Sequence, residues 1–83
     1  MKVRYFAWVR ERIGKAEEEI EIPAAIATVG ELVTWLAQRG EGYAYAFENP
    51  KVIRTAIDKN HVRADARLEG AREIAFFPPM TGG

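Results

Sequence analysis

The sequence predicts an α+β domain: a mixed β-sheet with one main helix packed on one face. Three observations lead to this prediction. Strand-like alternation occurs towards both ends of the chain, a capped amphipathic segment lies between them, and the hydrophobic content of 48% is that of a globular protein. Because a helix and a sheet must each bury an apolar face, the order strand, strand, helix and further strands places the helix on one side of the sheet.

The first strand is predicted in the stretch KVRYFAWV, residues 2–9, which is rich in aromatic and branched side chains. Alternation along a strand puts Val3 and Tyr5 on one face and Phe6 and Trp8 on the other. Two large aromatic rings on the second face are unusual for a surface that is left to solvent.

A turn and a second strand are predicted to follow. Residues 10–14 read as a turn that ends at Gly14. The stretch EEEIEIP, residues 17–23, predicts a strand with Ile20 and Ile22 on its inner face, closed by a proline. Since the two strands are close in sequence, we expect them to form a hairpin.

The helix is the most clearly marked element and is predicted at about residues 28–39. Thr28 and Glu31 have the spacing of a capping box. Apolar residues at positions 29, 32, 33 and 36 recur at helical spacing and form one stripe. Arg39 followed by Gly40 predicts a basic last turn and a glycine at the helix end.

The second half of the chain predicts three more strands. The stretch GEGYAYAFENP, residues 40–50, fits either a loop or a short irregular helix. A third strand is predicted in KVIRTAI, residues 51–57, with a turn at DKN and a short strand that begins HVRA. The last strand is predicted in REIAFF, residues 72–77.

The last strand has a buried face and an open face. Alternation places Ile74 and Phe76 on one face and Phe77 on the other. Pro78 and Pro79 end the strand, because neither can donate a ladder hydrogen bond.

An apolar patch is predicted on the sheet face that the helix leaves free. If the first and last strands are neighbours, Phe6, Trp8 and Phe77 share this face next to the end of the last strand. Exposed apolar patches of this kind mark interaction sites. We therefore expect this patch to be a docking surface for partner proteins.

Composition excludes several functions. Twelve basic and twelve acidic residues cancel, which leaves no positive excess for a nucleic-acid backbone. No apolar run is long enough to span a membrane and no signal peptide opens the chain, so we expect a cytoplasmic protein with neither nucleic acid nor membrane as partner. The absence of cysteine excludes disulfides and thiolate chemistry. His61, the one histidine, has no partner at ligand spacing, so no metal is expected.

No grouping of residues typical of catalysis occurs in the sequence. The acidic run at 17–19, with Glu21, could supply paired carboxylates, but the favoured interpretation is the solvated side of a strand. We therefore expect a chain that is non-catalytic by itself and binds no cofactor. The best candidate for chemistry is the end of the chain.

The chain ends in FFPPMTGG, and this ending predicts a reactive tail. Gly82 and Gly83 have no side chains, so they can enter a channel too narrow for other residues. The five residues from Pro79 to Gly83 reach about 17 Å when extended. Joining the terminal carboxylate to AMP would give a mixed anhydride that sulfur or an amine can attack. The predicted division is a folded domain at 1–78 and an extended tail at 79–83.

Two stretches carry a resemblance to a known family. EIAFFPPMTGG, residues 73–83, and VRYFAWVRERIG, residues 3–14, resemble the molybdopterin synthase small subunits, which are ubiquitin-like sulfur carriers. The capped helix at Thr28 also falls where that family has its helix. The chain departs from the family pattern at Ala71 and Arg72, at Ile57 and Asp58, and at Met80, which replaces a more usual valine. None of these positions touches the diglycine.

The resemblance implies a β-grasp fold and a sulfur-carrying chain end. Gly83 would be adenylated by a ubiquitin-activating-like adenylyltransferase that uses ATP and magnesium, and then converted to a thiocarboxylate. The tail would enter the large subunit of molybdopterin synthase, within a heterotetramer, and pass sulfur to a cyclic pyranopterin precursor. Thr81 and Gly82 would be the threaded tail, and the docking residues would be Phe77, Pro78, Pro79 and Met80.

Two other interpretations stay open. One is a related carrier for thiamine synthesis or transfer-RNA thiolation, or a modifier that is conjugated to lysines. The other is an interaction module without tail chemistry. An extra residue after Gly83 distinguishes them, because it would abolish a carrier's function and change nothing in a module.

Overall fold

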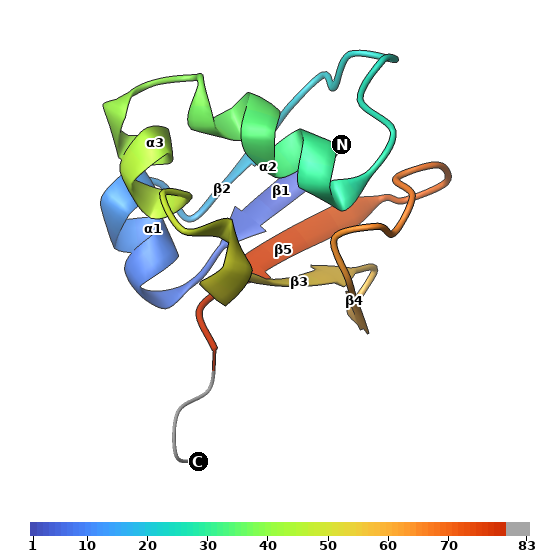
Figure 1. The fold of residues 1–83 in the computed structure, drawn as a ribbon. Coiled ribbons are helices and arrows are strands. Elements are labelled where there is room, and N and C mark those ends of the chain that lie inside the picture. The colour runs from blue at the N-terminus through green and yellow to red at the C-terminus, as the bar shows by residue number, and fades with distance from the viewer. Residues whose placement is uncertain (80–83) are drawn as a thin grey trace.

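A five-stranded mixed sheet with helices on one side forms the domain, which confirms the predicted α+β class (Figure 1). The computed structural model describes residues 1–79. The strands are β1 (Lys2–Tyr5), β2 (Glu17–Glu19), β3 (Arg54–Ile57), β4 (Asn60–Val62) and β5 (Glu73–Phe77). The helices are α1 (Ala7–Ile13), α2 (Val29–Ala37) and α3 (Glu41–Ala46), with a 3₁₀ turn η1 at Pro50–Val52.

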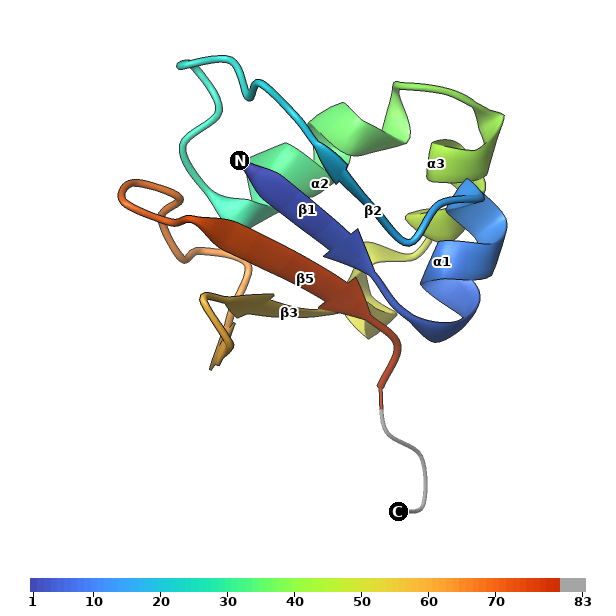
Figure 2. The same ribbon diagram turned by 180° about the vertical axis from the view of Figure 1, so that it is seen from behind.

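The last strand lies in the middle of the sheet. The strand order is β2-β1-β5-β3-β4, with β1 and β5 parallel and the other pairs antiparallel. Tyr5 lies opposite Phe76 in the parallel pair. The first and last strands are therefore neighbours, which was the condition for the predicted patch, and Figure 2 shows them side by side from the sheet side.

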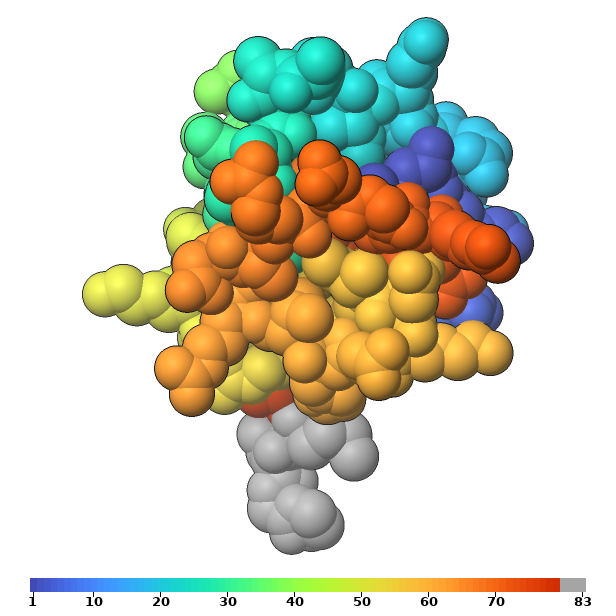
Figure 3. All heavy atoms as spheres, turned by 90° about the vertical axis from the view of Figure 1, so that its right-hand side faces the viewer, coloured from blue at the N-terminus to red at the C-terminus, as the bar shows by residue number. Residues whose placement is uncertain are grey.

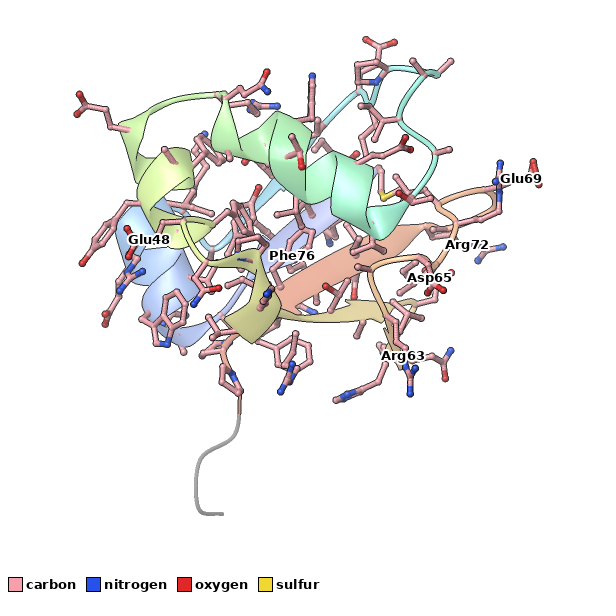
Figure 4. The ribbon with its side chains drawn as sticks, viewed as in Figure 1. Glu48, Arg63, Asp65, Glu69, Arg72 and Phe76 are labelled. Carbon is pink, nitrogen blue, oxygen red and sulfur yellow. The ribbon has the colours of Figure 1, made fainter. Side chains whose placement is uncertain are left out.

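The core lies between the sheet and the helices. Val3 and Tyr5 from β1, Ile74 and Phe76 from β5, and Leu32 from α2 have exposed fractions of 0–1%. Figure 4 shows Phe76 pointing from β5 towards the helices. The predicted inner and outer faces of the last strand are confirmed, since its outward neighbours are only half-buried.

The first predicted strand is too long, because the chain turns into a helix after Tyr5. Residues 7–13, predicted as strand and turn, form α1. Ala7 has a positive φ of 52°, which changes the chain direction, and Val9 is fully buried within the helix. Gly14 ends α1 in the left-handed region, at φ 90°, and its N–H donates to the carbonyl of Arg10 at 2.8 Å. β1 and β2 pair as expected, but α1 joins them instead of a tight turn.

The capping box of the main helix is confirmed. The Glu31 N–H donates to Oγ1 of Thr28 at 3.2 Å, and the Thr28 N–H donates to Oε1 of Glu31 at 3.0 Å. The predicted end of the helix is wrong. α2 ends at Ala37 with no basic residue in its last turn, and Gly40 is the N-cap of α3. The short-helix alternative for residues 40–50 is thus the correct one.

The hairpin of β3 and β4 has the predicted turn. Asp58 and Lys59 both have positive φ, 47° and 73°, as a two-residue hairpin turn of type I′ requires. The Asp58 carboxylate accepts from the N–H groups of Arg72 and Glu73 at 3.0 and 2.9 Å, which ties the turn to the start of β5.

The segment after β4 returns to the main helix. The N–H of Gly30 donates to the carbonyl of Ala64 at 2.8 Å, and the N–H of Val29 donates to that of Ala66 at 3.0 Å. Figure 3 shows this segment, in orange, against the start of α2, in green. Over residues 1–79, no helix is long and apolar enough to cross a membrane.

Candidate functional site at the end of the last strand

The end of β5 is held from both sides. Phe77 lies opposite Arg54 of β3, and the N–H of Phe6 donates to the carbonyl of Phe76 at 3.1 Å. The ladder stops at Pro78 and Pro79, which have no N–H to donate. The position and direction in which the chain leaves the sheet are therefore fixed by a central strand (Figure 2).

Phe6 and Phe77 both lie on the open face of the sheet near the end of β5. Phe6 is extended, at φ −127° and ψ 154°, and it follows Tyr5, whose register partner is Phe76. The Phe6 side chain therefore faces away from the core and is 37% exposed. We call Phe6, Phe77 and the residues that contact their rings, Arg4 and His61, the tail-root surface. Their role in partner binding stays a prediction.

Two contacts orient the rings of the tail-root surface. The guanidinium carbon of Arg4 lies 5.1 Å from the centre of the Phe6 ring. His61, which projects from β4, meets the Phe77 ring edge to face with centres 5.3 Å apart. His61 thus packs beside Phe77, the last residue of β5.

Trp8 does not belong to this surface. It lies on α1, where Arg12 stacks on its ring at 4.3 Å and on the ring of Tyr45 at 3.9 Å. The prediction that Trp8 shares a sheet face with Phe6 and Phe77 is wrong, because the chain turns at Ala7. Trp8 and Tyr45, which is 52% exposed, instead form a second aromatic cluster on α1 and α3.

The tail itself lies mostly outside the described residues. Pro78 and Pro79 are half-buried and stand directly after β5. Met80, Thr81, Gly82 and Gly83 are not among the residues that the structure describes, so their predicted roles stay predictions.

The charges around the tail-root surface are largely compensated. Arg4 lies 3.8 Å from carboxylate oxygens of both Glu17 and Glu73, and Lys2 lies 3.4 Å from Glu17. Pairs this exposed contribute little to stability. Arg54, opposite Phe77, has no ion pair within residues 1–79. An acidic group on a docked partner would therefore meet an unpaired cation beside the chain exit.

A carboxylate on the core side of β2 was missed by the sequence reasoning. Oε2 of Glu18 accepts hydrogen bonds from the hydroxyls of Tyr5 at 2.8 Å and Tyr43 at 2.7 Å. Its other oxygen lies 3.3 Å from Lys15 and 3.6 Å from Arg39. The signal was present, because alternation from Ile20 puts residue 18 on the inner face.

The Glu18 cluster is electrostatically well defined. Burial raises the pKa of Glu18, but hydrogen bonds from Tyr43, Tyr5 and Lys15 outweigh it and hold the pKa below the usual carboxyl range. Burial, and then the hydrogen bond to Glu18, raise the pKa of Tyr5 far above that of a free phenol. With its side chain only 12% exposed, Glu18 joins β1, β2 and α3 as a structural tie.

Within residues 1–79, no group of three histidine, cysteine, aspartate or glutamate side chains is placed to hold a metal ion. The described part of the site thus consists of a fixed strand end and an aromatic surface beside it.

Comparison with known proteins extends to the whole chain. The ThiS family model matches residues 3–83. The molybdopterin synthase sulfur carrier subunit of Escherichia coli is 37% identical over 83 residues, covering 100% of this chain and 99% of the relative. The protein of that name from Haemophilus influenzae is 36% identical, with the same coverage.

Solved structures have the same fold. A putative molybdopterin converting factor subunit 1 from Pyrococcus furiosus superposes with a TM-score of 0.74 and 28% identity, over 95% of each chain. SAMP1 from Haloferax volcanii gives a TM-score of 0.71 at 23% identity, over 100% of this chain and 98% of its own, and this likeness concerns the fold alone. The ubiquitin-like β-grasp fold that the family resemblance implied is confirmed.

Proposed function

We propose, because this chain belongs to the ThiS family, that it is a sulfur carrier and the small subunit of a molybdopterin synthase. One observation carries the proposal. Two bacterial proteins named molybdopterin synthase sulfur carrier subunit are 36–37% identical to this chain along its whole length. The matched region includes the tail-root surface and Gly83.

The proposed chemistry takes place at the carboxylate of Gly83. The carboxylate attacks the α-phosphate of ATP, which forms an acyl adenylate and releases pyrophosphate. Sulfur at the oxidation level of sulfide then attacks the carbonyl carbon, and AMP leaves. The product is a thiocarboxylate. In this scheme the activating adenylyltransferase binds ATP and magnesium, and this chain supplies only its own terminal group.

The fold supports such a role by the way β5 presents the chain end. A central strand, paired with β1 up to Phe76 and with β3 up to Phe77, gives the tail a fixed origin. A partner that docks on the tail-root surface can therefore place its active site at a constant distance from that origin. Gly82 and Gly83, having no side chains, suit a narrow channel in that partner.

The proposed partners are the activating adenylyltransferase and the large subunit of molybdopterin synthase. In the proposed heterotetramer, the thiocarboxylate enters the large subunit and transfers sulfur to a pyranopterin precursor. Phe6, Phe77, Pro78, Pro79 and Met80 make the contacts, with Thr81 and Gly82 in the channel. The cytoplasmic location expected from the sequence stays a prediction.

The test is the intact mass of the chain after reaction. We would incubate it with a molybdopterin-type adenylating enzyme, ATP, magnesium and a sulfide source. The expected result is the replacement of one oxygen by sulfur, located at Gly83 by fragmentation. A matched control carries one alanine after Gly83 and should stay unmodified while remaining folded. If enzyme that modifies a known carrier leaves this chain without AMP or sulfur, the proposal is wrong.

The acceptor assay separates this function from the related ones. A carrier for thiamine synthesis or transfer-RNA thiolation would also form the thiocarboxylate, and a protein modifier would transfer its carboxyl group to lysines. Only the proposed function predicts that the thiocarboxylated chain, mixed with a large synthase subunit and the pyranopterin precursor, yields molybdopterin.

A further inference from the structure

A groove on the helix side of the sheet lies apart from the tail-root surface. It has a volume of about 490 Å³ and is lined by α2, η1, the start of β3 and the end of β4. This volume is large enough for a few side chains of a bound segment. Its apolar lining includes Val33, Ile53 and Val62, of which Val33 and Ile53 are less than 10% exposed.

At one end the groove is closed where the start of α2 meets the segment after β4. Gly30 bonds to the carbonyl of Ala64, and a Cβ at Gly30 would lie 3.3 Å from that oxygen. From this contact the helix runs away from β4 towards α3, past η1 (Figure 1). Thr34, one turn further on, uses its hydroxyl to donate to the Gly30 carbonyl and lines the groove.

The groove has a single sign of charge. Its lining contains Lys51, Arg54 and Arg63 and no acidic residue. None of the three has an ion pair within residues 1–79, whereas Arg4 and Arg12 each lie within 4 Å of a carboxylate. Since basic and acidic residues balance over the whole chain, this imbalance is local.

Of the three cations, Lys51 and Arg63 are the two whose side chains a bound segment would meet. The register of Arg54 opposite Phe77 puts its side chain towards the open face of the sheet, so it contributes to the groove mainly through its backbone. Lys51 on η1 and Arg63 after β4 are both exposed and stand on different walls. Figure 4 shows Arg63 beyond β4, well apart from Arg72 near the start of β5.

We propose that this groove binds an acidic, partly apolar peptide segment of a partner protein. The apolar floor takes two or three aliphatic side chains, and carboxylates on either side of them pair with Lys51 and Arg63. Cations on separate walls suit charges that are spread along a peptide, whereas a small anion is held by groups that converge on one point. The groove lies on the other side of the sheet from the tail-root surface, so both can be occupied together.

The test uses a defined peptide. A synthetic heptapeptide with three central valines between pairs of aspartates is titrated into labelled full-length protein and followed by backbone amide NMR. The expected shifts cluster at Val33, Ile53, Val62 and Ala64 and leave Phe77 unchanged. Binding should weaken with salt, because charge pairing contributes to it. The same peptide with lysines in place of aspartates should not bind.

Charge reversal provides the second measurement. The variant Lys51→Glu with Arg63→Glu should weaken the peptide dissociation constant at least tenfold. The matched control Arg72→Glu, an exposed arginine outside the groove, should change it less than twofold. Both positions are exposed, so the far-ultraviolet circular dichroism of each variant should match that of the parent chain.

Three outcomes would overturn the proposal: no shifts at millimolar peptide, shifts centred elsewhere, or equal binding of the lysine peptide. A fourth would be groove shifts with inorganic pyrophosphate but none with the peptide, which would indicate a site for small anions. The sulfur-transfer assay is independent of this result, because the groove variants retain Gly83 and the tail-root surface.

Discussion

Replacing Glu18 by alanine should strongly destabilise the fold, although the residue sits in a run of three surface-like glutamates. In the structure its Oε2 atom accepts from the hydroxyls of Tyr5 and Tyr43 at 2.8 and 2.7 Å. Tyr5 is only 1% exposed, so without Glu18 its hydroxyl would be buried with no partner. Glu18→Ala therefore removes a hydrogen-bond acceptor that water cannot easily replace.

The magnitude follows from these contacts. Leaving a buried hydroxyl without a partner costs about 1–3 kcal/mol, and a hydrogen bond to a charged group contributes about 1.5–3 kcal/mol. Tyr43 is only partly buried and regains water, so the two contributions do not add fully. We expect a loss of about 2–4 kcal/mol, out of a total of about 4–12 kcal/mol for a domain of this size.

The measurement is urea unfolding of the parent chain, Glu18→Ala and the control Glu21→Ala. Glu21 is exposed and has no ion pair among the described residues, so its loss should change the free energy of unfolding by less than about 0.5 kcal/mol. A cycle with Tyr5→Phe isolates the coupling, which should exceed about 1 kcal/mol. If Glu18→Ala and Glu21→Ala have the same stability, the reasoning about the buried acceptor is refuted.

The same cluster makes a pH prediction. In the folded state the pKa of Glu18 lies below the ordinary carboxyl value of 4.5, so the unfolded chain binds the proton more tightly. Its contribution to stability is therefore complete above pH 4.5 and is lost as the pH falls through the folded-state pKa. The stability difference between the parent chain and Glu18→Gln should be constant near neutrality and shrink below that pH. Parallel curves down to acid unfolding would contradict this assignment.

Three further substitutions test the packing, the cap and the docking surface. Gly42→Ala should destabilise the fold by about 1–2 kcal/mol, because a Cβ there would lie 2.6 Å from the backbone oxygen of Arg12. This strain should exceed the gain in helix propensity from alanine. A variant that is more stable in thermal unfolding would refute this close approach. Thr28→Ala should cost about 1 kcal/mol in urea unfolding through loss of the capping bond to the Glu31 N–H, and Thr28→Ser should restore most of it. Phe77→Ala should weaken binding to a synthase large subunit by about 1–3 kcal/mol in calorimetry. Phe77→Ala should lower the free energy of unfolding by about 1–2 kcal/mol, which is less than the loss of a fully buried phenylalanine, because the ring is half-buried. A large drop in Tm with unchanged binding would place the ring in the core.

Patterns that arise from near neighbours in the chain were predictable. The capping box needs only Thr28 and Glu31, three residues apart. Alternation in the last strand identified Ile74 and Phe76 as buried and Phe77 as outward. The end of the strand at Pro78 follows from a missing N–H, which is a property of the residue itself.

Other features were decided by contacts between distant segments. Residues 7–13 form a helix rather than a strand because this helix buries Val9 in the core and because Gly42 lets α3 approach α1. The change of chain direction at Ala7, where α1 begins, separates Trp8 from Phe6 and removes Trp8 from the predicted patch. The sequence alone gives no sign of this, since the partner segment lies about thirty residues away and its approach depends on one missing Cβ.

By itself, then, the sequence determined the helix start and the faces of the last strand, because each depends on covalent geometry or on neighbours within one helical turn. The sulfur chemistry of the chain end stays a prediction. Only the tertiary structure decided that Glu18 faces Tyr5 and Tyr43, 13 and 25 residues away in the chain. It also decided that the basic groove forms between α2 and β4. Burial and pairing are properties of atoms that meet in space, and the chain must be folded before those atoms meet.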